Sequence, residues 1–257
     1  MPTVSRAHSF NAAAAQYAAN RPSYPPALLD AVEDAAGRPL AGARVADVGA
    51  GTGISTALLH ARGARVVAVE PGEGMAVEFR RALHGVPIVR GDGNALPLAD
   101  ASLDLLTYAQ SWHWTEPARS APEAMRVLRP GGALALWWNT VALDVPWIAA
   151  QHERIARHVG VGTGASQRPD EVRATELSGL ANLPGRGEVT LRHVRWSRLV
   201  PLDTHLANIG SHSAFLVLEE GDAQAFLTEE RARVGELFPD GTVEETYVVE
   251  LLVATRI

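Results

Sequence analysis

Three acidic residues stand at the ends of short apolar runs, and glycines follow the first of them. Asp47 precedes the glycine-rich residues 49–53, Glu70 closes a run of valines and alanine, and Asp92 follows a third apolar run. Carboxylates accept hydrogen bonds from ammonium and hydroxyl groups, and a glycine-rich turn lets the backbone approach a ligand closely. This pattern predicts a site for a small polar ligand at one edge of a sheet.

The glycine spacing separates two cofactor classes. A dinucleotide site favours G-x-G-x-x-G, with a helix N-terminus facing the pyrophosphate. Here Gly49, Gly51 and Gly53 are spaced G-x-G-x-G, and Ile54 stands where the third glycine of a dinucleotide site would be. Asp47 would also repel a pyrophosphate, whereas it can bind the ammonium of an amino acid directly or through water. The loop therefore favours S-adenosylmethionine (SAM), and a strand–turn–helix without a ligand is the alternative.

The other two acids fit the rest of that cofactor. A carboxylate at the tip of a second strand, Glu70, can accept both hydroxyls of a ribose. Asp92, in a turn after the third strand, can bind the edge of an adenine together with its neighbouring backbone. The alternatives are a solvated acid at a strand end for Glu70 and a plain turn for Asp92.

The elements that would position these residues alternate along the chain. Apolar runs predict strands over residues 44–48, 65–69, 87–90, 103–108 and 133–138, with helices over 55–61, 75–83 and 118–128 between them. A further helix over 27–36 precedes them. This alternation indicates a parallel sheet covered on both faces. After residue 138 the pattern changes, and we expect helices over 144–160, 171–180, 203–210 and 222–237, with strands over 188–196 and 242–255.

Together with the helix end and strand start at residues 126–134, these motifs resemble the class I SAM-dependent methyltransferase family, in its small-molecule branch often called type 11. The motifs cover roughly residues 40–140, in the family's order. The resemblance implies an α/β fold with a Rossmann-like, doubly wound, seven-stranded sheet that is mostly parallel with one antiparallel strand. It also implies an N-terminal lid and helix over residues 1–36, a SAM-binding core over 37–140, and a cap insertion that completes the sheet over 141–257.

The resemblance also places residues around the cofactor. It implies that the glycine loop surrounds the methionine part, that Met75 packs near adenine, and that Asn94 contacts adenine. Residues after the fourth strand would line the methionine side. The expected cofactor-binding residues are Asp47, Gly49, Ala50, Gly51, Gly53, Glu70, Pro71, Met75, Asp92, Gly93, Asn94, Ala109 and Gln110.

A weaker resemblance, to a subgroup that includes trans-aconitate methyltransferases, covers the N-terminal segment and the stretch Ser111-Trp112-His113-Trp114. It supports a small-molecule acceptor without identifying it. His113 is the candidate general base, because an unperturbed imidazole titrates near neutrality; a loop-capping role is the alternative, and a carboxylate acceptor would need no base. The expected substrate-binding residues are Tyr17, Arg21, Tyr24, Trp112, His113, Trp114 and Trp138.

Composition limits the partners and the chemistry. The chain of 257 residues has a net charge of −6 and no cysteine, so thiolate catalysis and zinc–thiolate sites are excluded, and we expect no metal site. Its basic residues are not clustered, which argues against nucleic acid. No apolar run is long enough to cross a bilayer, and the first residues do not resemble a secretion signal. We therefore expect a cytoplasmic monomer or homodimer.

The predicted function is transfer of a methyl group from SAM to oxygen, nitrogen or carbon of a small molecule, as in secondary metabolism, with S-adenosylhomocysteine (SAH) as the product. Two alternatives stay open. One is an NAD(P)-dependent oxidoreductase on a related sheet, which the glycine spacing disfavours. The other is a SAM-binding protein that transfers no methyl group.

Overall fold

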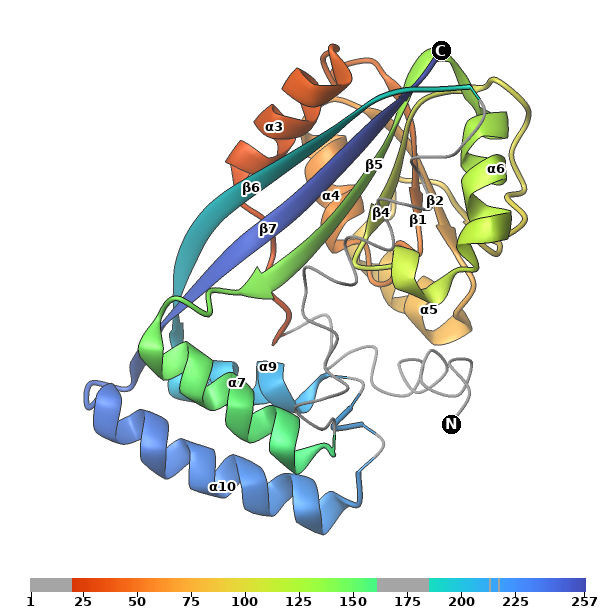
Figure 1. Ribbon diagram of the computed structural model, residues 1–257. Coiled ribbons are helices and arrows are strands. Elements are labelled where there is room, and N and C mark those ends of the chain that lie inside the picture. Colours follow the sequence, from red (N-terminus) through yellow and green to blue (C-terminus); the bar gives the residue numbers. More distant parts are fainter. Residues whose placement is uncertain (1–19, 161–184, 213, 217) are drawn as a thin grey trace. The chain divides into compact units, whose positions relative to one another are not determined.

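The structure is a computed structural model, and it describes residues 20–160, 185–212, 214–216 and 218–257. Seven strands form one sheet in the order β3-β2-β1-β4-β5-β7-β6 (Figure 1). The strands are β1 (Arg44–Val48), β2 (Arg65–Glu70), β3 (Ile88–Arg90), β4 (Leu103–Ala109), β5 (Leu128–Val141), β6 (Arg186–Pro201) and β7 (Thr242–Arg256). The helices are α3 (Pro26–Ala36), α4 (Ile54–Ala61), α5 (Glu73–Ala82), η1 (Trp112–Trp114), α6 (Pro117–Val127), α7 (Pro146–His158), α9 (Leu202–Gly210) and α10 (Glu220–Leu237).

The first five strands are parallel neighbours, and their order reverses between β1 and β4. β1 pairs with β2 on one side and β4 on the other, while β3 pairs with β2 and β5 with β4. β7 runs against the other strands (Figure 1). The predicted doubly wound, mostly parallel sheet with one antiparallel strand is therefore confirmed. In such sheets ligands bind beyond the carboxyl ends of the strands where the order reverses, which here is the edge formed by the ends of β1 and β4.

Local sequence explains most of the element boundaries. Proline at the first helical positions fits the start of α3, and Gly37, in the left-handed conformation, ends it. β5 begins at Leu128, five residues before the predicted strand. The pairing shifts register between Leu103 and Leu105 of β4, opposite the turn that contains Gly131. This irregularity lets β5 start earlier than its apolar run suggests.

The chain divides into two compact units. Among the described residues, the core unit comprises 23–139, 185–194 and 249–257, and the helical unit comprises 20–22, 140–160 and the described part of 195–248. α3 belongs to the core unit, and the expected N-terminal lid and helix over residues 1–36 stays a prediction. The last residues of β7 also belong to the core unit, so each of β5, β6 and β7 contributes residues to both units.

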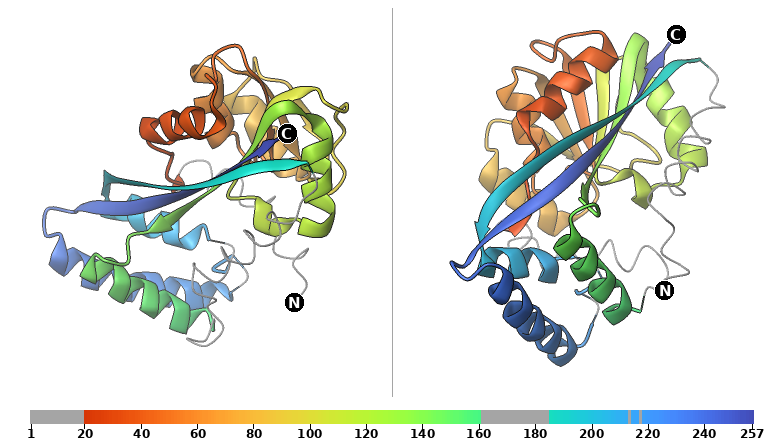
Figure 2. Two further views of the ribbon diagram at one scale, coloured as in Figure 1. Left: turned by 45° about the horizontal axis from the view of Figure 1, so that its top comes forward. Right: turned by 60° about the vertical axis from the view of Figure 1, so that its left-hand side comes forward.

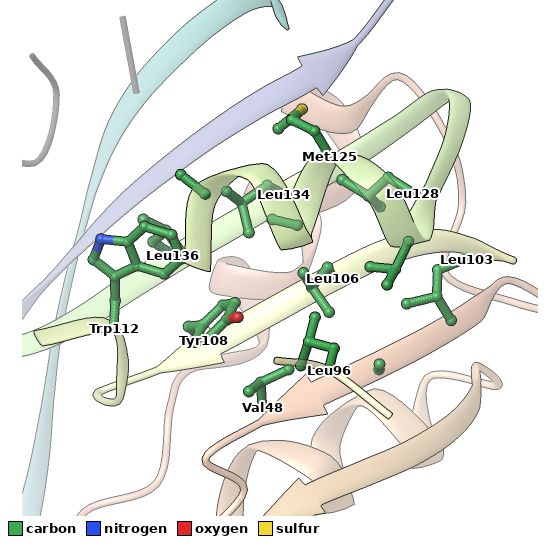
Figure 3. Close-up of a cluster of buried hydrophobic side chains, with 14 of the residues drawn as sticks. Val48, Leu96, Leu103, Leu106, Tyr108, Trp112, Met125, Leu128, Leu134 and Leu136 are labelled. Carbon is green, nitrogen blue, oxygen red and sulfur yellow. The ribbon is translucent and has the colours of Figure 1, made fainter. Parts of the chain in front are cut away.

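The core unit is a sheet with helices on both faces (Figure 2). α4 packs against β2, and α5 packs against β2 and β3. On the opposite face, α6 contributes to the main hydrophobic cluster, in which Trp112 and Tyr108 lie beside the leucines of β4 and β5 (Figure 3). The residues of this cluster show which face each strand residue occupies, because side chains alternate along a strand.

The helical unit contains α7, α9 and α10 and the adjoining strand segments. Two small apolar clusters hold it together, one around Leu206, Phe215 and Phe226 and the other around Val234 and Val243. Among the described residues, no helix is both long and apolar enough to span a membrane.

Candidate cofactor site

The glycine loop joins β1 to α4 and needs glycine for different reasons at each position. Gly49, Gly51 and Gly53 all have positive φ, of 65°, 58° and 94°. A Cβ atom on Gly49 would lie 2.5 Å from the Cβ of Ser111, and one on Gly53 would lie 2.7 Å from a methyl of Leu83. A Cβ on Gly51 would meet no heavy atom within 4 Å. Protein atoms therefore crowd the loop at Gly49 and Gly53, and the Gly51 side is open.

The loop also satisfies its own backbone donors. The amides of Gly49 and Ala50 donate to the carbonyl of Val69, at 2.8 and 3.2 Å, and the amide of Gly53 donates to the carbonyl of Ala50 at 2.9 Å. The amide of Gly51 donates to Oε2 of Glu70 at 2.8 Å. Phosphate-binding loops instead direct free amides at the anion. Four amides of this loop are thus committed to protein acceptors.

Glu70 links the glycine loop to the tip of β2. Its second oxygen, Oε1, accepts the amide of Gly72 at 2.6 Å, so the two carboxylate oxygens hold the turns after β1 and β2 together. The side chain is buried, and this burial raises its pKa above the usual value. Each carboxylate oxygen has a second lone pair, so both can still accept a ligand hydroxyl. Glu70 and the glycine loop, both expected at one edge of the sheet, are thus in direct contact.

Asp47 lies inside the sheet. Its side chain is fully buried, Thr56 donates its hydroxyl to Oδ2 at 2.6 Å, and Thr107 donates to Oδ1 at 2.7 Å. Burial raises the pKa of this carboxyl to about 6, although both hydrogen bonds act in the opposite direction. The contact of Asp47 with an ammonium stays a prediction. The sequence analysis did not identify the two threonines that bind the carboxylate. Their role depends on cross-strand register, which no local motif indicates.

After β3, the predicted adenine-binding residues form a hydrogen-bonded turn. Oδ1 of Asp92 accepts the backbone and side-chain N–H groups of Asn94 at 2.9 and 3.0 Å. Oδ1 of Asn94 in turn accepts the amide of Glu116 at 2.7 Å. Asn94 therefore positions the turn, and the exposed Asp92 is the better placed of the two to meet a ligand. Gly93 is buried, and its carbonyl accepts the hydroxyl of Tyr108 at 3.3 Å.

Two other predicted cofactor residues flank this region. Met75 is buried in α5, and Pro71 is exposed in the turn after β2. Neither placement tests the predicted contact with a cofactor.

The residues after β4 include a strained position. Gln110 has φ +58°, which is uncommon for a residue other than glycine. Its amide donates to the carbonyl of Trp137 at 2.9 Å, and its side-chain Nε2 donates to the carbonyl of Asn139 at 3.2 Å. Ala109 and Gln110 are both half-buried at the carboxyl end of β4. Such strain is often found at functional sites, which agrees with the role predicted for Gln110.

After Gln110, the three residues predicted to bind the methyl acceptor differ in their burial. Ser111 crosses over the end of β1, where its hydroxyl donates to the carbonyl of Val48 at 2.6 Å. Trp112 is buried in the main hydrophobic cluster, with its ring 4.8 Å from that of Tyr108 (Figure 3). His113 is exposed, with its ring 4.8 Å from the half-buried ring of Trp114. Packing alone accounts for the burial of Trp112, whereas His113 is accessible as a base.

The paired tryptophans of β5 face opposite sides, as alternation requires. Trp138 belongs to the main hydrophobic cluster, so packing accounts for its burial as well. Trp137 points to the other face, where the ring of Tyr24 lies edge-on to it at 6.1 Å. Trp137 is therefore a candidate that the sequence analysis did not select. Only the packing of β5 shows which of the two adjacent tryptophans faces this side.

The remaining predicted acceptor residues do not belong to the core unit. Arg21, in the helical unit, donates to the carbonyl of Ser211 at 3.3 Å. Tyr17 lies outside the described residues. Their predicted roles therefore stay predictions.

The helical unit contains a buried polar network of its own. Glu245 accepts hydrogen bonds from Arg198 at 2.6 Å and from Tyr247 at 2.8 Å, and it contacts Nδ1 of His205 at 2.7 Å. These partners keep the pKa of Glu245 low, although its burial acts in the opposite direction. The network satisfies its buried charges internally, as a structural network does. Within the described ranges, no cluster of three or more histidine, aspartate or glutamate side chains could hold a metal.

Comparison with known proteins places this site in a family. Residues 46–136 match the family model of the methyltransferase domain. An uncharacterised methyltransferase of Mycobacterium tuberculosis is 45% identical over 149 residues, which are 58% of this chain and 59% of that protein. Demethylmenaquinone methyltransferase of Clavibacter sepedonicus is 42% identical over 102 residues, which are 38% of this chain and 42% of that protein. The matches thus span less than two thirds of the length of these relatives.

A solved structure extends the similarity beyond the matched domain. A protein from Anaeromyxobacter dehalogenans described as a type II methyltransferase has a TM-score of 0.61 and 24% identity, covering 91% of this chain and 97% of that chain. At this identity the similarity shows the fold alone. The family match identifies residues 46–136 as a methyltransferase domain, and the solved structure shows that the chain has a methyltransferase fold.

Proposed function

We propose that this protein transfers the methyl group of SAM to a small-molecule acceptor. The observation that carries the proposal is the junction of Glu70 with the glycine loop, where a buried carboxylate at the tip of β2 bonds to the amide of Gly51 at 2.8 Å. In this proposal the carboxylate beside the open side of the loop at Gly51 would bind the ribose.

The residues present fit the cofactor. The open space at Gly51 can admit a ligand, and the buried hydroxyl of Thr52 has no hydrogen-bond partner among the described residues. We infer that Glu70 would accept the ribose hydroxyls and that Asp92 would meet the adenine. The glycine loop would lie against the methionine part, with Ala109 and Gln110 on its other side.

The loop amides argue against the oxidoreductase alternative. A pyrophosphate needs several backbone donors, and the amides of Gly49, Ala50, Gly51 and Gly53 all donate within the protein. A nucleoside without phosphates makes no such demand. The family match supports the same choice, because it covers the loop and both strand tips.

The chemistry requires little covalent assistance from the protein. When bound, SAM supplies a methyl group that is already activated by its sulfonium, and transfer is an in-line displacement. The task of the chain is to align the acceptor and to exclude water. His113, exposed after β4, is the residue that would take a proton from an acceptor that still holds one. Trp114 beside it would contact a flat or apolar acceptor.

Titration calorimetry tests the choice of cofactor. We expect SAH to bind the wild-type protein and NADH to show no binding. Binding of NADH without binding of SAH would contradict the proposal.

A matched pair of variants tests the role of Glu70. Glu70→Gln removes the charge that would accept the ribose hydroxyls, so we expect the affinity for SAH to fall about tenfold or more. Glu73→Gln changes an exposed acid in the first turn of α5 and should leave the affinity within about twofold. Equal affinities in the two variants would refute the role of Glu70. Alanine at position 70 is a poorer test, because it would leave two buried amides without an acceptor.

An assay of SAH release separates an enzyme from a protein that only binds SAM. The protein is incubated with SAM and with small molecules bearing carboxylate, hydroxyl or amine groups. We expect release that depends on one acceptor class. Binding of SAH without release on any acceptor class would favour a non-methylating role.

A further inference from the structure

The core unit contains a buried tryptophan whose one polar atom has no partner. Trp137 is 1% exposed, and its indole Nε1 has no hydrogen-bond partner among the described residues. An indole N–H can only donate, and leaving a buried donor unpaired is unfavourable. Such a donor needs an acceptor that the described residues do not supply, and at the ligand edge of the sheet a ligand can supply it.

Strand alternation places Trp137 on the face of the sheet that carries Asp47. Val48 of β1 and Leu136 and Trp138 of β5 all belong to the main hydrophobic cluster, so their neighbours Asp47 and Trp137 face the other way. Trp137 pairs with Ala109 at the end of β4, and β4 lies between β1 and β5. Two strand spacings, about 10 Å, thus separate the two strands that carry Asp47 and Trp137.

Small residues lie between them. Thr107, which binds Asp47, and Ala109, which pairs with Trp137, are the last two residues of β4 on this face, next to its carboxyl end. The face at this edge is therefore bounded by a carboxylate at one side and an indole donor at the other.

The hydrogen-bonding groups of the methionine part indicate which of them Trp137 would bind. That part presents an ammonium, which only donates, and a carboxylate, which only accepts. The four loop amides already donate to protein acceptors and are not available to the carboxylate. The buried hydroxyl of Thr52 also has no hydrogen-bond partner among the described residues, but a hydroxyl can rotate to donate or accept. The indole is the donor with one fixed direction.

We propose that the indole N–H of Trp137 binds the carboxylate of the methionine part of the cofactor. This inference rests on the proposed function, because it assumes that SAM and SAH bind beside the glycine loop. It adds a cofactor contact on β5, beyond the predicted contacts on the loop and the tips of β2, β3 and β4. A hydrogen bond to a charged acceptor is about twice as strong as a neutral one, so its loss should be measurable.

The test compares two ligands and two variants by calorimetry. SAH carries the carboxylate, and 5′-methylthioadenosine has the same nucleoside without the amino-acid part. Trp137→Phe keeps an aromatic ring and removes the N–H, so we expect the affinity for SAH to fall about tenfold and the affinity for 5′-methylthioadenosine to change less than about twofold. Trp112→Phe is the matched control. Its indole N–H is also buried without a hydrogen-bond partner among the described residues, but the ring lies in the main hydrophobic cluster, so both affinities should be unchanged.

The outcomes are distinct. Equal weakening of both ligands by Trp137→Phe, or unchanged affinity for SAH, would overturn the inference while leaving the proposed function intact. Failure of both ligands to bind the wild-type protein would overturn the proposed function, and the inference with it.

A second measurement avoids the variant, should it fail to fold. In an ¹⁵N–¹H spectrum of the wild-type protein, the indole proton of Trp137 should shift downfield with SAH and much less with 5′-methylthioadenosine. The same shift with both ligands would overturn the inference.

Discussion

Asp47 makes a testable contribution to stability because it is a buried acid held by neutral hydroxyls. Burial raises its pKa to about 6, from an ordinary value of 3.8. At roughly 1.4 kcal/mol per pH unit, the ionised carboxylate destabilises the folded state by about 3 kcal/mol. The folded-state pKa lies above the unfolded one, so this penalty is absent below about pH 4 and complete above about pH 6 to 7. The contribution of Asp47 to stability therefore falls as the pH rises.

Asp47→Asn should remove this dependence. The amide carbonyl can accept one threonine hydroxyl, and the amide N–H can donate to the other, so both Thr56 and Thr107 keep a partner. We expect the variant to equal the wild type near pH 4 and to be more stable by up to about 3 kcal/mol at pH 7.5. Urea unfolding followed by tryptophan fluorescence at several pH values measures the difference. A difference that does not grow with pH would refute the assignment of the raised pKa to Asp47.

Asp104 on the neighbouring strand supplies a control of opposite sign. Burial alone would raise its pKa, but the amide of Arg44 and the guanidinium groups of Arg129, Arg44 and Arg38 outweigh burial and lower it. Its stabilising contribution is therefore present above the ordinary pKa and lost as the pH falls through the lowered one. Asp104→Asn should accordingly be less stable than the wild type at neutral pH, and the gap should close in acid.

Three further variants test the loop and the acceptor side. Gly49→Ala should destabilise the fold by more than about 3 kcal/mol, because its Cβ would lie 2.5 Å from the Cβ of Ser111. Gly51→Ala should still fold, with about 1 kcal/mol of backbone strain, because its Cβ would enter open space. The same Cβ would occupy space proposed for the cofactor, so we expect Gly51→Ala to lose SAH affinity. Thermal unfolding and calorimetry measure both, and a stable Gly49→Ala or a fully binding Gly51→Ala would count against this account of the loop. His113→Ala should lower turnover and spare SAH affinity; undiminished turnover would remove the base assignment.

The sequence predicts the parallel strands well because each is a short apolar run bounded by glycine or by a change of period. It places β1 at the residues observed, and β2 and β4 within one residue. It misses the early start of β5 because the turn around Gly131 reads as an interruption, whereas the sheet absorbs it as a shift in register. Pairing between strands decides this, and no window of one strand contains that information.

The site residues also divide into those that local sequence predicts and those that depend on strand pairing. Glu70 and the glycine loop are recognisable because their spacing is local, and the hydrogen bond between them follows from the order of two adjacent strands. The partners of Asp47 are not recognisable, because Thr107 follows it by 60 residues and meets it only through the pairing of β1 with β4. Trp137 is missed for a related reason. Alternation shows that one of two adjacent tryptophans faces the site, and only the cluster around Trp138 shows which.

The self-satisfied loop has a consequence for binding. An anion-binding loop has unpaired amide donors when no ligand is bound. Here four amides are already bonded to protein acceptors, namely the carbonyls of Val69 and Ala50 and the carboxylate of Glu70. Binding then requires little ordering of the backbone, so less of the interaction energy is lost. In the proposed complex, recognition would then depend on side chains whose hydrogen-bonding capacity is not used up, among them the remaining lone pairs of Glu70, the carboxylate of Asp92 and the indole of Trp137. A ligand rich in phosphate would find four amides of this loop already bonded to protein acceptors, which agrees with the proposed preference for a nucleoside joined to an amino acid.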